Sequence, residues 1–168
     1  MPLKRTPLKR KTPLRAKRKP KSNLQKRKDK MDSPYWDKKC HTAVAQWAHK
    51  SKCVICGKRE PEVGLIAGHH LIRKSRSRLL RWHPMNIIPL CEEHHLNSVD
   101  MAPHSDNPLA VKRFLEKLEV LEPRRYNWLV ENQDAIRKTD MRGQIEKPDW
   151  RYQLTIWEQK ARDLDAIG

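Results

Sequence analysis

One segment near the start of the chain has apolar residues at helical spacing. Ser33 and Pro34 form a cap and first turn that are typical of a helix start. The apolar residues that follow recur every three or four positions and are Trp36, Cys40, Ala43, Val44 and Trp47. This period matches one face of an α-helix. We therefore predict a helix over residues 34–50 whose apolar stripe packs into a core, with His41 and His49 off that stripe on the surface.

Two shorter apolar runs predict strands. Residues 63–72 contain glycines that permit sharp turns or bulges, and residues 87–90 form a second short run. Together they predict a small antiparallel hairpin with a long basic connection. We expect one helix to begin at Cys91 and another at residues 106–108, where Asn precedes Pro. Two further helices, in which the sequence indicates no chemistry, are expected over residues 124–137 and 148–165.

Positive charge is concentrated at the start of the chain. Residues 1–30 hold 14 Lys and Arg against one Asp, whereas residues 101–168 hold 12 basic against 12 acidic residues. A Pro-Leu-basic unit repeats in this segment, which has too few apolar residues to offset chain entropy. We therefore expect a disordered arm that contacts nucleic acid through basic residues such as Lys4, Arg5, Lys9 and Arg10. A targeting peptide or an RNA-binding extension is the alternative, although the prolines argue against a mitochondrial presequence.

Two features of composition indicate the compartment. No continuous apolar run is long enough for a signal peptide or a transmembrane helix, so we expect a cytoplasmic protein without a membrane partner. Three of the four cysteines have the spacing of metal ligands, and only Cys40 does not. Metal-bound thiolates suit a reducing compartment better than a disulfide framework does. Cys40 is expected to be a buried small residue.

Paired cysteine and histidine residues predict a structural zinc site. The expected ligands form two pairs, each with two residues between its members: Cys53 with Cys56, and Cys91 with His94. His95 is an alternative fourth ligand, because Cys-x3-His also occurs in zinc sites. Successive residues on a helix diverge by about 100°, so His94 and His95 cannot easily bind the same ion. We assign His94 to zinc.

A second set of polar residues is not needed by this zinc site: His69, His70, Asn86 and His95. The order of these residues along the chain resembles that in the HNH endonucleases of the ββα-metal superfamily. The resemblance is to the zinc-containing form found in small bacterial and phage nucleases. The resemblance covers about residues 50–118. It implies an α+β fold: a small zinc-stabilised ββα-metal (HNH) core with flanking helices and the disordered basic arm. The expected divisions are the arm (1–30), the HNH domain with zinc knuckles (31–122) and a helical C-terminal extension (123–168).

The resemblance also implies roles for these residues. His70 is the general base, His69 and His95 hold one catalytic divalent ion, and Asn86 orients the base. The chemistry of histidine agrees, because its ordinary pKa of about 6.5 lets it accept a proton near neutral pH. Adjacent strand residues project to opposite sides, so His69 and His70 can have different roles. Asn86 could instead be a turn residue before the strand.

The chain departs from the simplest family pattern after His95, because no histidine follows one helical turn later. The segment 102–108 resembles an element of phage-type members, so His104 is the expected third metal ligand. It could also be a loop histidine or a phosphate contact. His83 is expected to be structural or to face the substrate.

The predicted connection between the strands holds five cations and no acid: Arg73, Lys74, Arg76, Arg78 and Arg81. A solvated loop is the ordinary reading of such a run. Here the run lies beside the presumed scissile phosphate, which favours phosphate anchoring.

These observations predict a metal-dependent DNA endonuclease that hydrolyses phosphodiester bonds. The expected cofactors are structural Zn²⁺ and a catalytic Mg²⁺ or another divalent transition metal, and the expected partners are DNA and phage recombination or packaging proteins. One alternative is a non-catalytic zinc-stabilised module that binds DNA or RNA, and another is a basic assembly protein with an inactivated nuclease-like domain. The intact His-His, Asn and His set favours the enzyme.

Overall fold

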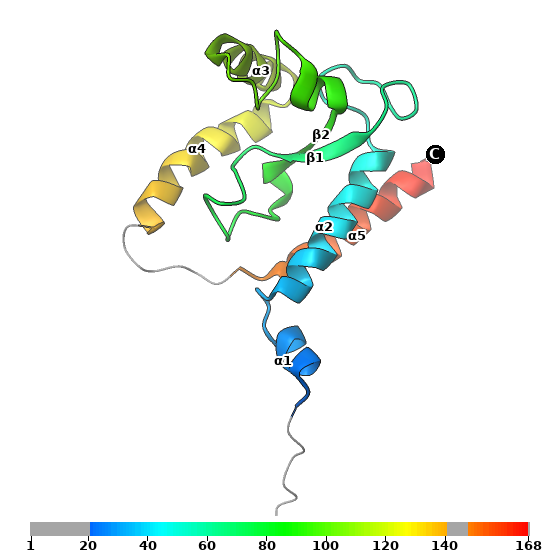
Figure 1. Cartoon of the computed structure of the whole chain (residues 1–168), viewed down its shortest axis with the longest axis vertical. Helices are drawn as coiled ribbons and strands as arrows, with labels where there is room; N and C mark the ends of the chain where they lie inside the picture. The colour runs from blue at the N-terminus through cyan, green and yellow to red at the C-terminus, as the bar shows by residue number, and fades with distance from the viewer. Residues whose placement is uncertain (1–20, 141–147, 168) are drawn as a thin grey trace, which may run out of the picture.

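A two-stranded antiparallel sheet lies at the centre of the molecule, with helices packed around it (Figure 1). The computed structural model describes residues 21–140 and 148–167, with the side chains of residues 134–140 excepted. The elements are α1 (Asn23–Asp29), α2 (Pro34–Lys50), β1 (Ile66–His70), the 3-10 turn η1 (Pro84–Asn86), β2 (Ile87–Cys91), the π-helical turn η2 (Glu93–Asn97), α3 (Pro108–Leu121), α4 (Pro123–Asp140) and α5 (Trp150–Ile167). The predicted mixture of helices with one small sheet is confirmed.

Local sequence signals mark the starts of two helices. The helix predicted over residues 34–50 is α2, which begins at Pro34 directly after Ser33, whose side chain makes no cap hydrogen bond among the described residues. The Asn107 side chain caps α3, because its Oδ1 accepts a hydrogen bond from the Leu109 N–H at 3.0 Å. The two later predicted helices correspond to α4 and α5, and each observed boundary lies within a few residues of the predicted one.

The short helix α1 lies inside the segment that was expected to be disordered. Ser22 caps it by accepting a hydrogen bond from the Gln25 N–H at 3.2 Å, and basic residues in its last turn suit the negative end of the helix dipole. The expectation of disorder therefore does not hold for residues 23–29. Lys4, Arg5, Lys9 and Arg10 lie outside the described residues, so their contacts with nucleic acid stay a prediction.

The hairpin is shorter at its first strand than the sequence predicted. β1 covers Ile66–His70 instead of residues 63–72, because Gly64 takes a left-handed turn with φ of +69° just before the strand. The strands pair so that Ile66 lies opposite Cys91 and His70 lies opposite Ile87. This register brings the His-His pair to the end of β1 that is nearest the start of β2.

Two apolar clusters hold the hairpin from different sides. On one side α2 and α5 lie side by side and bury Trp47 and Trp157 (Figure 1). On the other side residues 53–56 pack with Ile88 of β2 and Phe114 of α3. A Cβ atom at Gly68 would lie 2.6 Å from Val44 Cγ1, so a glycine is required where α2 approaches β1.

Both C-terminal helices pack on the elements around the hairpin. The Trp157 indole N–H donates to the Trp82 carbonyl at 2.8 Å. The Arg125 guanidinium of α4 donates to the carbonyls of Pro84 and Ile87 at 2.8 and 3.0 Å. The division predicted at residue 122 is not tested by these contacts and stays a prediction. None of the described helices combines the length and apolarity needed to cross a membrane.

Candidate metal sites and active site

The predicted cysteine and histidine ligands come together in one cluster. The ligand atoms of Cys53, Cys56, Cys91 and His94 all lie within 4.8 Å of one another. His94 Nδ1 lies 3.1 Å from Cys91 Sγ and 3.8 Å from Cys53 Sγ. A tetrahedral zinc ion with bonds of about 2.0–2.3 Å separates its ligand atoms by about 3.5–3.8 Å. The cluster, hereafter the Cys₃His cluster, could therefore hold a metal ion such as zinc.

Backbone hydrogen bonds shape the first knuckle of this cluster. The Gly57 N–H donates to the Cys53 carbonyl at 2.8 Å, and Gly57 has a left-handed φ of +71°. The Cys53 N–H donates to the Lys58 carbonyl at 2.8 Å, which closes the turn. The Val54 N–H donates to the Pro89 carbonyl at 3.0 Å and docks the knuckle on β2. These contacts place Cys53 beside Cys91.

The protonation of the cysteines also suits a cation. Burial acts to raise the pKa of the Cys53 thiol, but the N–H groups of Cys91, Cys56 and Ile55 outweigh it and leave that pKa lowered. Burial raises the pKa of Cys91 to about 11, and the neighbouring Cys53 sulfur adds to the effect. The fold thus lowers the pKa of one thiol and raises the pKa of its neighbour, and a bound cation would favour the thiolate form of both.

Three histidines form a second cluster, which we call the trihistidine cluster. The nearest ring nitrogens of His69, His95 and His104 lie within 4.8 Å of one another. The ring centroids are separated by 4.7 to 5.1 Å. His69 is 4% exposed and packs edge-on against Phe114 of α3. His104, the predicted third ligand, reaches the cluster from the loop before α3.

The turn η2 directs two neighbouring histidines to different clusters. A helix was expected to begin at Cys91, and the structure has only a single helical turn shortly after it. Residues Glu93–Asn97 form a π-helical turn, closed by a hydrogen bond from the Ser98 N–H to the Glu93 carbonyl at 2.7 Å. Turns of this kind are frequent at functional sites. His94 belongs to the Cys₃His cluster and His95 to the trihistidine cluster.

Burial and neighbouring imidazoles favour the neutral form of two members of the trihistidine cluster. Burial lowers the pKa of His69 well below its ordinary value, and the neighbouring His95 and His104 lower it further. Burial also lowers the pKa of His95, and His104 adds to this. Neutral imidazoles are the form that binds a metal. Three ring nitrogens at this separation fit one divalent ion.

His70 points away from this cluster, as neighbouring positions on a strand do. Its ring lies edge-on to the Trp82 ring with 5.3 Å between centroids. Burial lowers the pKa of His70 to about 3, with a further contribution from Lys74, so the ring is neutral at pH 7. One ring nitrogen is hydrogen-bonded to the Arg81 backbone, while the buried Nε2 has no partner among the described residues. His70 therefore has the protonation state of a general base.

Asn86 is fully buried and holds the connection between the strands. Its Oδ1 accepts from the Ile72 N–H at 2.7 Å, and its Nδ2 donates to the carbonyls of Ile72 and Leu80 at 3.1 and 2.9 Å. Asn86 was expected to orient His70 from the neighbouring strand. Within the described part of the chain its hydrogen bonds run to the connection instead, so it acts on His70 only through the segment that carries Arg81. Asn86 is more than the turn residue that was the alternative.

Replacing Asn86 with alanine should lower the free energy of unfolding by about 3 kcal/mol, because each buried group left unpaired costs about 1–3 kcal/mol. Urea unfolding of Asn86→Ala measures this change. Asn97→Ala is the matched control, since Asn97 is exposed on η2. Equal stability of the two variants would contradict the role given to Asn86.

The five cations of the connection divide into two groups. Arg81 forms an ion pair with Asp37 at 3.0 Å, and Arg78 approaches Asp32 at 3.3 Å. Both guanidinium groups also lie over the Trp150 ring, at 5.5 and 5.4 Å. These contacts tie the two arginines to α2, to the residue Asp32 before it and to α5. The expected phosphate anchoring by both arginines stays a prediction.

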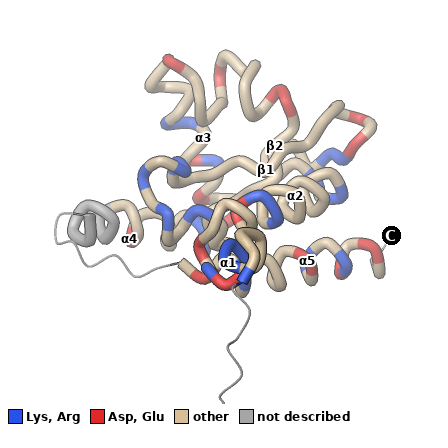
Figure 2. Tube along the Cα trace, turned by 60° about the horizontal axis from the view of Figure 1, so that its bottom comes forward, with Lys and Arg blue, Asp and Glu red and all other residues tan. Residues whose placement is uncertain are grey.

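The other three cations remain accessible. Arg73 and Arg76 are exposed, and the Lys74 ammonium lies over the Trp82 ring at 5.4 Å. Figure 2 shows basic positions along α1 and along the connection between the strands. Arg73, Lys74 and Arg76 are the members of the run best placed to meet an anion.

Sequence reasoning missed some of the residues around His70. His41 is exposed on α2, as expected, but it also lies near His70 and Trp82, with ring centroids of His41 and Trp82 at 6.2 Å. No local pattern indicates this contact, which depends on how α2 packs. His83 stacks on Trp128 with centroids at 5.0 Å and planes at 2°, which agrees with the expected structural role.

No protein-family model, no curated protein and no solved structure matches this chain. The two clusters that could hold metal ions, His70 and the hairpin are therefore the features that indicate its class.

Proposed function

We propose that this protein is a metal-dependent DNA endonuclease of the HNH type. The Cys₃His cluster binds structural zinc, and the trihistidine cluster binds one catalytic divalent ion. The observation that carries the proposal is the position of His70, a half-buried neutral histidine with a buried Nε2, next to His69 of a three-histidine cluster. A module that only binds nucleic acid needs neither a second metal nor a neutral histidine beside it.

The chemistry assigned to the chain's own residues is simple. His70 Nε2 accepts a proton as the oxygen of a water molecule forms a bond to phosphorus, and the bond from phosphorus to the leaving oxygen breaks. The leaving oxygen takes a proton from solvent. The Arg81 backbone binds the other ring nitrogen of His70 and so fixes the tautomer. When bound, the divalent ion neutralises charge that develops on the phosphate.

The basicity of His70 depends on the substrate in this proposal. A pKa of about 3 makes a weak base at pH 7. An anionic phosphate close to the ring favours the protonated form and raises the pKa. Substrate binding therefore moves His70 toward the working range of a general base.

The donor set bears on the identity of the catalytic ion. Imidazole nitrogens suit zinc, nickel, copper and iron, whereas magnesium prefers oxygen ligands. Three histidines and no carboxylate make up the trihistidine cluster. We therefore favour a transition-metal ion over Mg²⁺ at this site.

DNA is the proposed partner. Arg73, Lys74 and Arg76, together with the basic arm of residues 1–30, would contact its phosphates. Such contacts position a nucleic acid without reading its sequence. The proposed setting is the cytoplasm of a bacterial or phage-infected cell, with phage recombination or packaging proteins as candidate further partners.

Replacing His95 with alanine should raise the ion concentration needed for half-maximal plasmid nicking by at least about 10-fold, and excess ion should restore part of the rate. The assay follows conversion of supercoiled to open-circular plasmid against Mn²⁺ or Ni²⁺ concentration. Leu96→Ala is the matched control, because Leu96 is the exposed neighbour of His95. An unchanged ion dependence of His95→Ala would remove the trihistidine cluster from the mechanism.

A further inference from the structure

Two consecutive residues of the connection between the strands hold the His70 ring. The Arg81 backbone is hydrogen-bonded to one ring nitrogen of His70. The Trp82 ring lies edge-on to the His70 ring, with 5.3 Å between centroids. The orientation of His70 therefore depends on how residues 81 and 82 are themselves held.

Other elements anchor the backbone on either side of Arg81. The Asn86 side chain donates from Nδ2 to the Leu80 carbonyl at 2.9 Å. The Trp157 indole N–H donates to the Trp82 carbonyl at 2.8 Å. These two hydrogen bonds fix the path of the backbone, but the side chains of residues 81 and 82 need contacts of their own.

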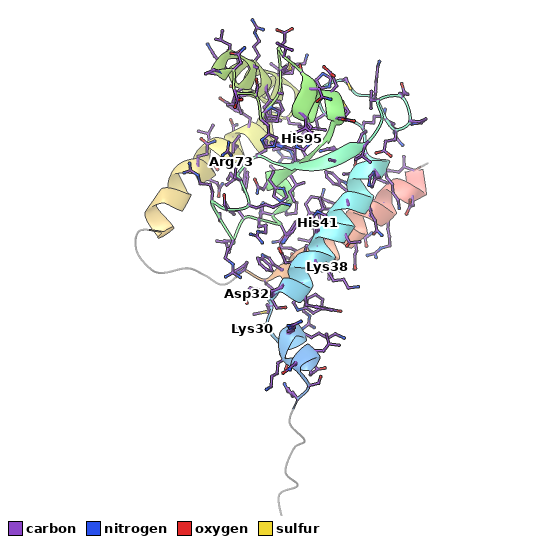
Figure 3. The ribbon with its side chains drawn as sticks, viewed as in Figure 1. Lys30, Asp32, Lys38, His41, Arg73 and His95 are labelled. Atoms are coloured by element: carbon purple, nitrogen blue, oxygen red, sulfur yellow. The ribbon has the colours of Figure 1, made fainter. Side chains whose placement is uncertain are left out.

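A single carboxylate oxygen binds both of these side chains. Asp37 Oδ1 accepts from the Arg81 guanidinium at 3.0 Å and from the Trp82 indole N–H at 2.8 Å. Asp37 lies in the first turn of α2, next to Lys38, where α2 passes the connection between the strands (Figure 3). Trp82 is only 1% exposed, so this oxygen also supplies the partner that a buried N–H needs. Asp37 thus contacts both residues that hold His70.

Asp37 is separate from the groups assigned to the reaction. It belongs to neither metal cluster, and it does not line the cavity of about 200 Å³ that His70 and Lys74 border. A carboxylate also repels a phosphate, so Asp37 is not a contact for DNA. Its charge does act on Lys74, which would alter DNA binding rather than the orientation of His70.

We propose that Asp37 is a positioning residue for His70, which holds Arg81 and Trp82 so that the imidazole keeps one tautomer and one orientation. The hydrogen bond that one ring nitrogen makes decides which nitrogen carries the proton. With one nitrogen bound to the Arg81 backbone, the buried Nε2 is left as the acceptor. Rotation of a released ring would exchange the two nitrogens. The role of Asp37 in cleavage rests on the proposed function, whereas its effect on the ring does not.

The nitrogen-15 chemical shifts of the His70 ring test this role without any substrate. The wild-type protein at pH 7 should show one tautomer, with Nε2 unprotonated. Folded Asp37→Ala should show the averaged shifts of two tautomers, because the residues that select the tautomer are released. Asp37→Asn keeps an Oδ1 acceptor, so its shifts should stay closer to wild type. Wild-type shifts in folded Asp37→Ala would overturn the proposal.

Asp165→Ala is the matched control. Asp165 forms an ion pair with Lys50 at 2.7 Å and so joins α5 to α2, as Asp37 joins α2 to the connection. Among the described residues it has no hydrogen bond to residue 81 or 82. Its removal should therefore leave the His70 shifts and the cleavage rate at their wild-type values.

The kinetics of plasmid nicking distinguish positioning of the base from binding of DNA. Asp37→Ala should lower kcat by about 10–100-fold, since a misplacement of about 1 Å can cost about 100-fold, and its KM for DNA should not rise. A wild-type kcat, or a KM that rises while kcat is unchanged, would contradict the proposal, and the second result would mean that Asp37 acts through Lys74. If the wild type does not nick DNA, the proposed function fails, and the nitrogen-15 shifts still decide whether Asp37 positions His70.

Discussion

Replacing His70 with alanine should lower DNA cleavage by about 10²–10⁴-fold, the usual contribution of general acid–base catalysis. Zinc content, folding and DNA binding should stay close to wild type. The reason is that His70 makes one hydrogen bond, to the Arg81 backbone, and belongs to neither metal cluster. A plasmid-nicking assay under saturating divalent ion measures the loss.

Two further variants serve as controls for His70→Ala. His69→Ala removes a ligand of the trihistidine cluster, so its cleavage should recover in part with excess ion, whereas that of His70→Ala should not. A preparation of His70→Ala that nicks DNA at the wild-type rate, while a zinc-site variant purified in parallel is inactive, would exclude His70 as the base. That result would favour the alternative that the protein is a non-catalytic module that binds nucleic acid.

Replacing Cys91 with serine should unfold the protein around the hairpin. Cys91 ends β2, and its sulfur lies 3.1 Å from His94 Nδ1 in the Cys₃His cluster. Structural zinc contributes about 10–16 kcal/mol of apparent binding free energy in small domains, which matches or exceeds the usual 5–15 kcal/mol stability of a domain. Elemental analysis and thermal unfolding followed by circular dichroism measure the two consequences.

Cys40→Ser is the matched control for this prediction. Cys40 is buried as the sequence predicted, and burial raises its pKa to about 12, so it stays a thiol. Its sulfur donates a hydrogen bond to the Trp150 carbonyl at 3.1 Å, which a serine hydroxyl can also do. Cys40→Ser should therefore fold and retain zinc. A folded, zinc-free Cys91→Ser protein with wild-type stability would refute the structural role.

The sequence predicted those features that depend on local rules. Ser33 before Pro34 and Asn107 before Pro108 set two helix starts, and the helix boundaries follow. The two-residue gaps in Cys53–Cys56 and Cys91–His94 indicated the ligands of the Cys₃His cluster, because the two members of each pair lie close together in a tight turn. The family resemblance selected His104, which the spacing alone did not.

The remaining features depend on contacts between segments that are distant in the sequence. His41 and His70 meet only because α2 packs against β1 at Gly68. Arg78 and Arg81 bind acidic residues of an earlier segment and the ring of Trp150, none of which a charge count reveals. The turn η2 is π-helical, and no propensity rule predicts that form.

The most direct test of the account is a plasmid-nicking assay with purified wild-type protein that retains its structural zinc. A mild chelator should abolish nicking without unfolding the protein, and restored Mn²⁺ or Ni²⁺ should recover it, because only the trihistidine cluster exchanges its ion. The account predicts nicking that depends on this added ion and is lost in His70→Ala. Persistent absence of cleavage with every divalent ion, in folded protein that binds DNA, would contradict it.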